Sequence, residues 1–262
     1  MVKRDELVKL IEDTVGQELL TKARHVDVSA NGVQVHGKSD IRKLALGVSC
    51  NLNFLHEAVS AGADLTLTHH GLNLSPKYVI GARLDPAAQG RLQFVFENNL
   101  TVAAFHYALD AQPEFGNSAT IIRELGAKRT GETYFDEWGY VGEFDKPRRA
   151  EELAKQCAEL FSHDIYAVYS GREMVRRIGV ATGGARLAGQ ELFEALDKKV
   201  DVHITGEIAE GHDHLVKECG ITYFAGGHYA TEVFGVQELG KRIKAYYKDK
   251  LEVEFIDVPN PL

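Results

Sequence analysis

The sequence alternates short apolar runs with amphipathic segments, and it does so twice in the same order. Strand-like apolar runs occur at 44–48, 64–68, 100–105, 177–181, 200–205, 221–224 and 251–257. Apolar residues at helical spacing occur at 4–15, 53–62, 86–99, 117–125, 150–156, 191–196, 209–219 and 235–247. Strands that alternate with helices predict an α/β fold with largely parallel sheets and helices on their faces.

The repeat predicts two similar α/β lobes. A charged, glycine-containing stretch at 128–132 is the first candidate for their boundary, and 144–147 is a second. We therefore expect an N-terminal lobe of residues 1–130 and a C-terminal lobe of residues 131–262. The C-terminal helix and strand are free to pack back on the first lobe.

Composition narrows the class of protein. The chain has 262 residues and a formal net charge of −8, which disfavours a non-specific nucleic-acid binder because such a protein needs a basic surface. Its three cysteines, Cys50, Cys157 and Cys219, are far apart and fit reduced, buried thiols in a reducing cytosol. The N-terminal residues do not resemble a signal peptide and no stretch is long enough to span a membrane, so we expect a cytoplasmic protein without membrane partners.

Candidate metal ligands follow the predicted strands. His69 and His70 end the second strand, and two units of equal spacing, His106 to Asp110 and His228 to Glu232, follow later strands. In open α/β sheets, sites lie beyond the carboxyl ends of the strands. Residues four apart on a helical turn share a face, so each unit can bring a nitrogen and an oxygen donor together. Four imidazoles and two carboxylates are too many for one tetrahedral ion and suit two ions bridged by a carboxylate.

Other interpretations stay open for several of these residues. His106 and His228 can each be hydrogen-bonded core histidines. Glu207 falls where His70 falls in the repeat, and it is either a catalytic residue or a cavity-lining one. The segment 182–185 predicts a strand-to-helix turn, with a backbone anion nest as the alternative.

Five strings in the same order resemble the NIF-three-like family, whose bacterial members are usually called GTP cyclohydrolase 1 type 2 homologs or dinuclear metal centre proteins. They are THHGL at 68–72, HYALDAQPEFGN at 106–117, ITGEIAE at 204–210, GGHYATE at 226–232 and FIDVPNP at 255–261. The resemblance spans nearly the whole chain, and the length of the chain resembles that of the short form of the family.

This resemblance implies a duplicated fold with a dinuclear metal site between the lobes. The metal ligands that it implies are His69, His70, Asp110, His228 and Glu232, with Glu232 as the bridging carboxylate. His106 lies in the second string, and we interpret it as a proton-handling residue outside the ligand set. The family also implies a toroidal homohexamer.

The leading hypothesis for the function is a metal-dependent hydrolase that activates water against a nucleotide such as GTP, with His106 or Glu207 moving protons. Mixed nitrogen and oxygen ligands suit two divalent ions of zinc, iron, manganese, cobalt or nickel. Three alternatives remain: a regulatory or metal-delivery protein without turnover, a nucleotide phosphoesterase, and a scaffold in which metals hold the lobes together.

Overall fold

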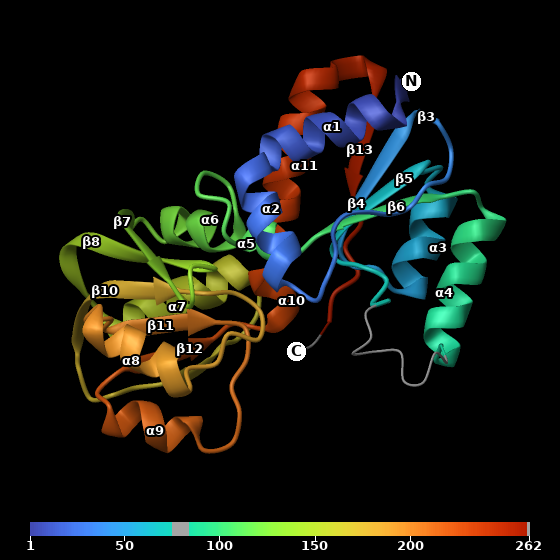
Figure 1. The fold of residues 1–262 in the computed structure, drawn as a ribbon. Helices are drawn as coiled ribbons and strands as arrows, with labels where there is room; N and C mark the ends of the chain where they lie inside the picture. Colours follow the sequence, from blue (N-terminus) through green and yellow to red (C-terminus); the bar gives the residue numbers. More distant parts are fainter. Residues whose placement is uncertain (75–83, 261–262) are drawn as a thin grey trace. The chain divides into compact units, whose positions relative to one another are not determined.

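The computed structural model describes residues 1–74 and 84–260. Its contacts divide the chain into two compact units, each of them mixed α/β (Figure 1). Unit 1 consists of Met1–Gln112 and Gly235–Val258, and unit 2 contains Pro113–Phe234 together with the residues from Pro259. Pro261, in the last of the five family strings, lies outside the described residues.

Unit 1 is built on a five-stranded sheet in the order β13-β4-β5-β6-β2. Its strands are β2 (Asn31–Val35), β4 (Lys43–Ser49), β5 (Leu65–His70), β6 (Thr101–Phe105) and β13 (Glu252–Phe255). Neighbouring strands from β13 to β6 are parallel, and β2 is antiparallel to β6. A small antiparallel pair joins β1 (Val2–Lys3) to β3 (Asp40–Ile41). The last strand of the chain therefore belongs to the sheet of the first unit.

Helices cover both faces of this sheet (Figure 1). They are α1 (Arg4–Val15), α2 (Gln17–Val26), α3 (Leu52–Ser60), α4 (Pro86–Glu97), the single turn α5 (Tyr107–Asp110) and α11 (Val233–Tyr247), which is followed by the 3-10 turn η1 (Lys248–Lys250). Ala45 packs in one cluster with Phe54 of α3 and Val95 of α4. Its neighbour Leu46 lies against Gly240 of α11. Adjacent strand residues point to opposite faces, so α3 and α4 cover one face and α11 the other.

Local sequence accounts for where two of the helices begin. Asn51 caps α3 by accepting a hydrogen bond from the amide of Phe54 (2.9 Å). Asp85 caps α4 in the same way, and Pro86 occupies the first turn, where the missing N–H costs nothing.

Unit 2 is built on a six-stranded sheet in the order β7-β8-β10-β11-β12-β9. Its strands are β7 (Lys128–Tyr134), β8 (Gly139–Arg149), β9 (Tyr166–Val168), β10 (Met174–Val180), β11 (Val202–Thr205) and β12 (Thr222–Ala225). Strands β10, β11 and β12 are parallel, and β9 is antiparallel to β12. The parallel strands β4, β5 and β6 of unit 1, followed by antiparallel β2, have the same arrangement.

Two apolar clusters cover the faces of the second sheet. The helices are α6 (Asn117–Glu124), α7 (Ala150–Phe161), α8 (Gly189–Asp197), α9 (His212–Glu218) and the single turn α10 (His228–Thr231). Residues of α6 and α7 pack in one cluster with Ile178 and Ile204. Residues of α8 and α9 pack in the other with Tyr134 and Tyr223. Each face of the sheet therefore has its own pair of helices.

The N-terminal segment of unit 1 ends at Gln112, before the boundary that the sequence suggests at 128–132. The reason is that α6 packs on the second sheet and β7 pairs with β8. Elements α2, β1, β2, β3, β7, β8 and β9 are not among those that the sequence analysis expects. Cys50 and Cys157 are buried as expected, whereas Cys219 is partly exposed.

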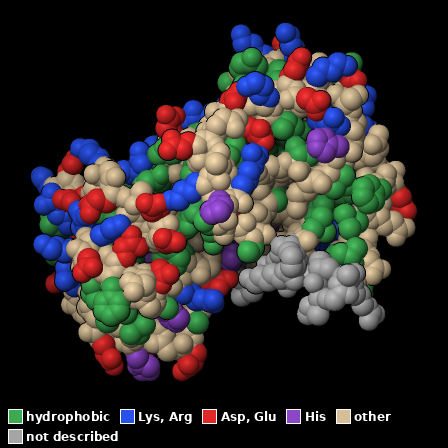
Figure 2. Space-filling view, viewed as in Figure 1, with side chains coloured by type: hydrophobic (Ala, Val, Ile, Leu, Met, Phe, Trp, Pro, Cys, Tyr) green, Lys and Arg blue, Asp and Glu red, His purple; other side chains and the backbone are tan. Residues whose placement is uncertain are grey.

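None of the helices in the described part of the chain has the length and apolarity that a membrane crossing requires. Figure 2 shows acidic and basic side chains interspersed over the face in view.

Candidate metal centre

In unit 1, candidate ligands lie at the carboxyl ends of two neighbouring parallel strands. Strand β5 continues through His69 and His70 rather than stopping before them, and His106 follows β6 directly. His69 is fully buried and His70 is half-buried. Their ring centroids are 4.8 Å apart, and the His106 ring lies 4.8 Å from that of His69. The parallel register of β5 and β6 thus gathers three imidazoles at one sheet edge.

A carboxylate joins this cluster through the single turn α5. His106 caps the turn and Asp110 ends it, so the two residues have the four-residue spacing of one helical face. Asp110 is buried, and its Oδ2 lies 3.5 Å from Nε2 of His69. Ring nitrogens of His69, His70 and His106 all lie within 4.8 Å of one another, a grouping compact enough to hold a metal ion.

Each of the three imidazoles is anchored through Nδ1 by a group of the same unit. The partners are the carbonyl oxygen of Phe105 (3.1 Å from His69), the hydroxyl of Ser49 (3.0 Å from His70) and the carboxylate of Asp27 (2.9 Å from His106). Carbonyl and carboxylate oxygens only accept, so Nδ1 of His69 and of His106 donates. When Nδ1 donates, Nε2 carries the lone pair that can bind a metal ion or accept a proton. Metal-binding histidines commonly have an outer hydrogen bond of this kind.

Asp27 is a site residue that the sequence analysis misses. Its side chain is 2 % exposed although it is charged. Burial alone would raise the pKa of Asp27, but the hydrogen bond and charge of His106, with hydrogen bonds from Ser29 and Asn31, lower it to about 2. Asp27 lies 79 residues from its imidazole partner, so no local spacing marks it.

In unit 2, three further candidates lie at the ends of β11 and β12. Glu207 lies two positions after the end of β11, and His228 opens the turn α10 after β12. His228 Nδ1 donates to Glu207 Oε1 (2.6 Å), and His228 Nε2 lies 3.2 Å from Glu232 Oε1. Glu232 is buried, whereas His228 and Glu207 are half-buried. The fourth candidate imidazole is therefore also held through Nδ1.

Two carboxylates, Glu207 and Glu232, make the electrostatic potential around His228 negative. Burial lowers the pKa of His228, but the hydrogen bonds and charges of Glu232 and Glu207 outweigh it and raise that pKa to about 9. Arg186 Nη1 contacts the other oxygen of Glu207 at 3.0 Å. A place that favours a proton between two carboxylates also favours a divalent cation, which would displace that proton on binding.

The loop between β10 and α8 lies against these residues. The amide of Gly183 donates to Thr231 Oγ1 (3.1 Å), and its carbonyl oxygen accepts from the amide of Gly206 (3.0 Å). Its backbone therefore supports a turn rather than an anion nest at this residue. A Cβ added to Gly183 would lie 2.1 Å from Glu232 Oε1, so only glycine allows this approach.

The donors fit divalent ions of the borderline or harder kind. Unit 1 supplies three imidazoles and one carboxylate, and unit 2 supplies one imidazole with the carboxylates Glu207 and Glu232. Nitrogen and oxygen donors without cysteine suit zinc, iron, manganese, cobalt or nickel. The chemistry of this donor set therefore agrees with the ions that the sequence suggests.

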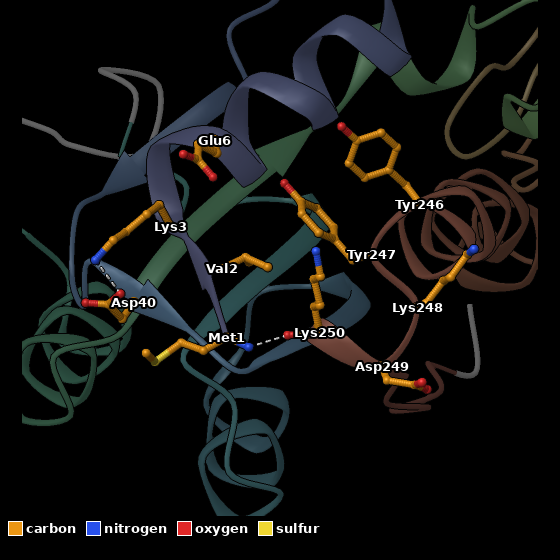
Figure 3. A pocket seen from close by; sticks show the side chains of 10 residues that line it. All are labelled: Met1, Val2, Lys3, Glu6, Asp40, Tyr246, Tyr247, Lys248, Asp249 and Lys250. Atoms are coloured by element: carbon orange, nitrogen blue, oxygen red, sulfur yellow. Dashed lines mark hydrogen bonds and ion pairs between the residues drawn. The ribbon is translucent and has the colours of Figure 1, made fainter.

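A pocket in unit 1 has no part in this chemistry. It has a volume of about 860 Å³ and lies where the first residues of the chain meet the end of α11. Figure 3 shows Lys3 and Asp40 paired on one side, at 2.6 Å, and Tyr246 and Tyr247 on the other. None of the candidate ligands lines it.

The fold and the site define a mixed α/β protein in which imidazoles and carboxylates gather at the carboxyl ends of parallel strands in each unit. The sequence profile of one family, Duf34/NIF3 (NGG1p interacting factor 3), matches residues 2–261. The chain belongs to this family, as the five sequence strings predicted.

Relatives and solved structures agree with this assignment. A GTP cyclohydrolase 1 type 2 homolog of Escherichia coli is 34% identical over 99% of this chain and 100% of its own length. One from Pseudomonas aeruginosa is 33% identical over 97% and 98%. The solved structure of a protein of unknown function, ybgI, superposes with a TM-score of 0.86 at 31% identity, covering 100% of both chains. One from Thermus thermophilus gives 0.81 at 27% identity, again over 100% of both.

Proposed function

We propose that the protein binds two divalent metal ions and uses them as a hydrolase. In this proposal the ligands are His69, His70 and Asp110 from unit 1 with His228 and Glu232 from unit 2, and Glu232 bridges the ions. Each unit supplies at least one imidazole and one buried carboxylate. Neither unit alone offers enough donor atoms to complete the tetrahedral coordination of two ions, so the proposed dinuclear centre uses ligands from both units.

The anchoring of the histidines carries the proposal. In all four candidate imidazoles Nδ1 is held by an oxygen of the same unit, at distances from 2.6 to 3.1 Å. Other histidines, such as His163 and His203, also have Nδ1 held by an oxygen, but the four candidates combine this anchoring with a position at strand ends beside buried carboxylates. Metal-binding histidines commonly have such an outer hydrogen bond, because it fixes the ring and raises the basicity of the ligating nitrogen.

The residues around the ligands suit proton transfer during hydrolysis. When bound, two divalent ions lower the pKa of a water and polarise the bond under attack. His106, anchored by Asp27, is the residue that accepts a proton from the attacking water. Glu207, held between Arg186 and His228, orients His228 and is the second candidate for moving a proton.

The substrate class comes from the relatives. The curated relatives carry the name GTP cyclohydrolase 1 type 2 homolog, so GTP is the first substrate to test. In that reaction water attacks carbon 8 of guanine, the imidazole ring of the base opens, and formate is released. A phosphoesterase acting on nucleotides would use the same residues and differ in releasing phosphate or pyrophosphate.

Elemental analysis of freshly purified, untagged protein tests the metal proposal. We expect near two ions per chain in the native protein and near none in the double variant His69→Ala/Glu232→Ala. The matched control is His36→Ala/Glu218→Ala, which removes one exposed histidine and one exposed glutamate and should keep both ions. Equal metal in all three proteins, or none after reconstitution with zinc, manganese and iron, contradicts the proposal.

Turnover is tested separately with the metal-loaded protein. We expect formate and an absorbance change from GTP, both abolished in His69→Ala/Glu232→Ala and kept in the control. Release of phosphate without formate would contradict the cyclohydrolase activity and favour a phosphoesterase activity. If the protein binds two ions but forms no product from a panel of nucleotides, the proposed nucleotide hydrolase activity is wrong and metal binding alone is supported.

A further inference from the structure

The segment 27–31, which joins α2 to β2, holds His106, the residue that directly follows β6. Asp27 Oδ2 accepts a hydrogen bond from His106 Nδ1 (2.9 Å) and another from the amide of Tyr107 (3.1 Å). Ser29 and Asn31 donate to the same carboxylate, each at 2.8 Å. The carboxylate is thus buried, fully engaged, and fixed independently of the imidazole that it contacts.

Asn31 completes the hold on His106 from the backbone side. Its Oδ1 accepts the amide of His106 (3.0 Å) and that of Ala108 (3.2 Å). The ring and the backbone of His106 therefore both depend on residues 27–31. A loop built in this way allows the imidazole little freedom to turn.

The chemistry of the partner fixes which ring nitrogen carries the hydrogen. An ionised carboxylate only accepts hydrogen bonds, so Nδ1 of His106 must be protonated. In the neutral imidazole, Nε2 is then the basic atom. The ring is 18 % exposed, and its centroid is 4.8 Å from that of His69 and 5.4 Å from that of His70. The basic atom therefore belongs to a ring that lies beside two candidate metal ligands.

We propose that Asp27 is a positioning residue that holds His106 as the Nδ1–H tautomer, so that Nε2 serves as a proton acceptor next to the metal centre. The tautomer follows from the contacts alone, whereas the catalytic use of Nε2 rests on the proposed hydrolase function. In that use an O–H bond of the attacking water breaks and its electron pair stays on oxygen. The proton forms the new Nε2–H bond and then passes to the leaving group, while Asp27 stabilises the imidazolium.

The first test examines the tautomer of His106 in the native protein. We expect nitrogen NMR of the full-length protein labelled in histidine to show a protonated Nδ1 and an unprotonated Nε2 for His106, with His106→Gln identifying the signal. The Nε2–H tautomer in the native protein would overturn the proposal.

Asp27→Asn gives the second test, because an asparagine amide no longer compels Nδ1 to donate. We expect the tautomer preference to be lost and metal-dependent kcat to fall on the order of 100-fold, with KM and metal content nearly unchanged. The control is Asp64→Asn, since Asp64 is a buried carboxylate of the same unit that holds Lys38 and Arg42 and no imidazole. It should leave both the tautomer and kcat near native values.

The outcomes separate the two proposals. An unchanged tautomer in Asp27→Asn, or loss of metal from His106→Gln to the extent seen in His69→Ala, overturns the role given to Asp27 and His106. The expected tautomers in a protein that shows no turnover would contradict the hydrolase and leave Asp27 as the residue that positions the ring.

Discussion

At the scale of single residues, the partners of the two ring nitrogens decide the role of a buried imidazole. His203 and His69 are both fully buried. His203 accepts from the Tyr134 hydroxyl at Nδ1 and donates from Nε2 to the carbonyl of Ala185, both at 2.8 Å. Both nitrogens are used within the core, so His203 has a structural role. His69 uses Nδ1 in this way, and its Nε2 faces a carboxylate.

His203 predicts a specific dependence of stability on pH. Burial lowers its pKa from 6.5 to about 4, against the raising effect of its hydrogen bond to Ala185. Between these values the unfolded chain binds more protons than the folded one, so stability is fully present above 6.5 and falls as pH drops toward 4. The loss is roughly 3 kcal/mol in the free energy of unfolding.

Urea unfolding of the metal-free protein at several pH values measures this loss. Trp138 is the single tryptophan and lies in unit 2 with His203, so its fluorescence reports on the relevant unit. His203→Gln should remove most of the decrease between pH 7 and pH 4.5, and His214→Gln, which changes an exposed histidine, should keep it. An equal decrease in all three proteins would show that other groups cause it.

At the scale of elements, the ends of strands position the candidate ligands, and this part of the site was predictable. His69, His70, His106 and His228 all lie at or just after a parallel strand, and apolar runs mark such strands in the sequence. The helices that separate them were predictable from their period of apolar residues. The hold of segment 27–31 on His106 was not, because it arises from contacts between residues far apart along the chain.

The loop between β10 and α8 carries the prediction at this scale. Gly183 has a φ of 63°, and an added Cβ would displace the end of the Glu232 side chain. Gly183→Ala should therefore cost roughly 1 kcal/mol of stability for the left-handed backbone and also weaken metal binding. Metal content after dialysis and the midpoint of urea unfolding are the two measurements.

Gly171→Ala is the matched control, since Gly171 has a φ of 87° and open space around its added Cβ. It should lose a similar amount of stability and keep its metal. If both variants retain metal equally, displacing the Glu232 side chain does not weaken metal binding, which contradicts a ligand role for Glu232.

At the scale of the whole molecule, the two units have a common core arrangement of three parallel strands with an antiparallel neighbour. The duplication that the repeat in the sequence suggests stays a prediction. The alternation of strands and helices predicted the parallel strands, but not the edge strands β2, β7 and β9, which are short or highly polar. The return of β13 to the first sheet depends on pairing with β4, more than 200 residues earlier in the chain.

The proposed centre shared by both units predicts that a change in unit 1 alters the metal response of unit 2. Zinc at about a hundredfold above its Kd should raise the free energy of unfolding, followed at Trp138 in unit 2, by about 2.7 kcal/mol. His69→Ala, in unit 1, should lose most of this gain, because the ion loses a ligand that unit 2 cannot replace.

An exposed histidine of unit 1 provides the comparison, since His36→Ala should keep the full gain. Without zinc, unfolding followed at Trp138 should be nearly the same in all three proteins, since neither histidine belongs to unit 2. A full zinc response in His69→Ala would mean that unit 2 binds its ion alone. The ligands of the two units would then form separate sites, and the bridging role proposed for Glu232 would be wrong.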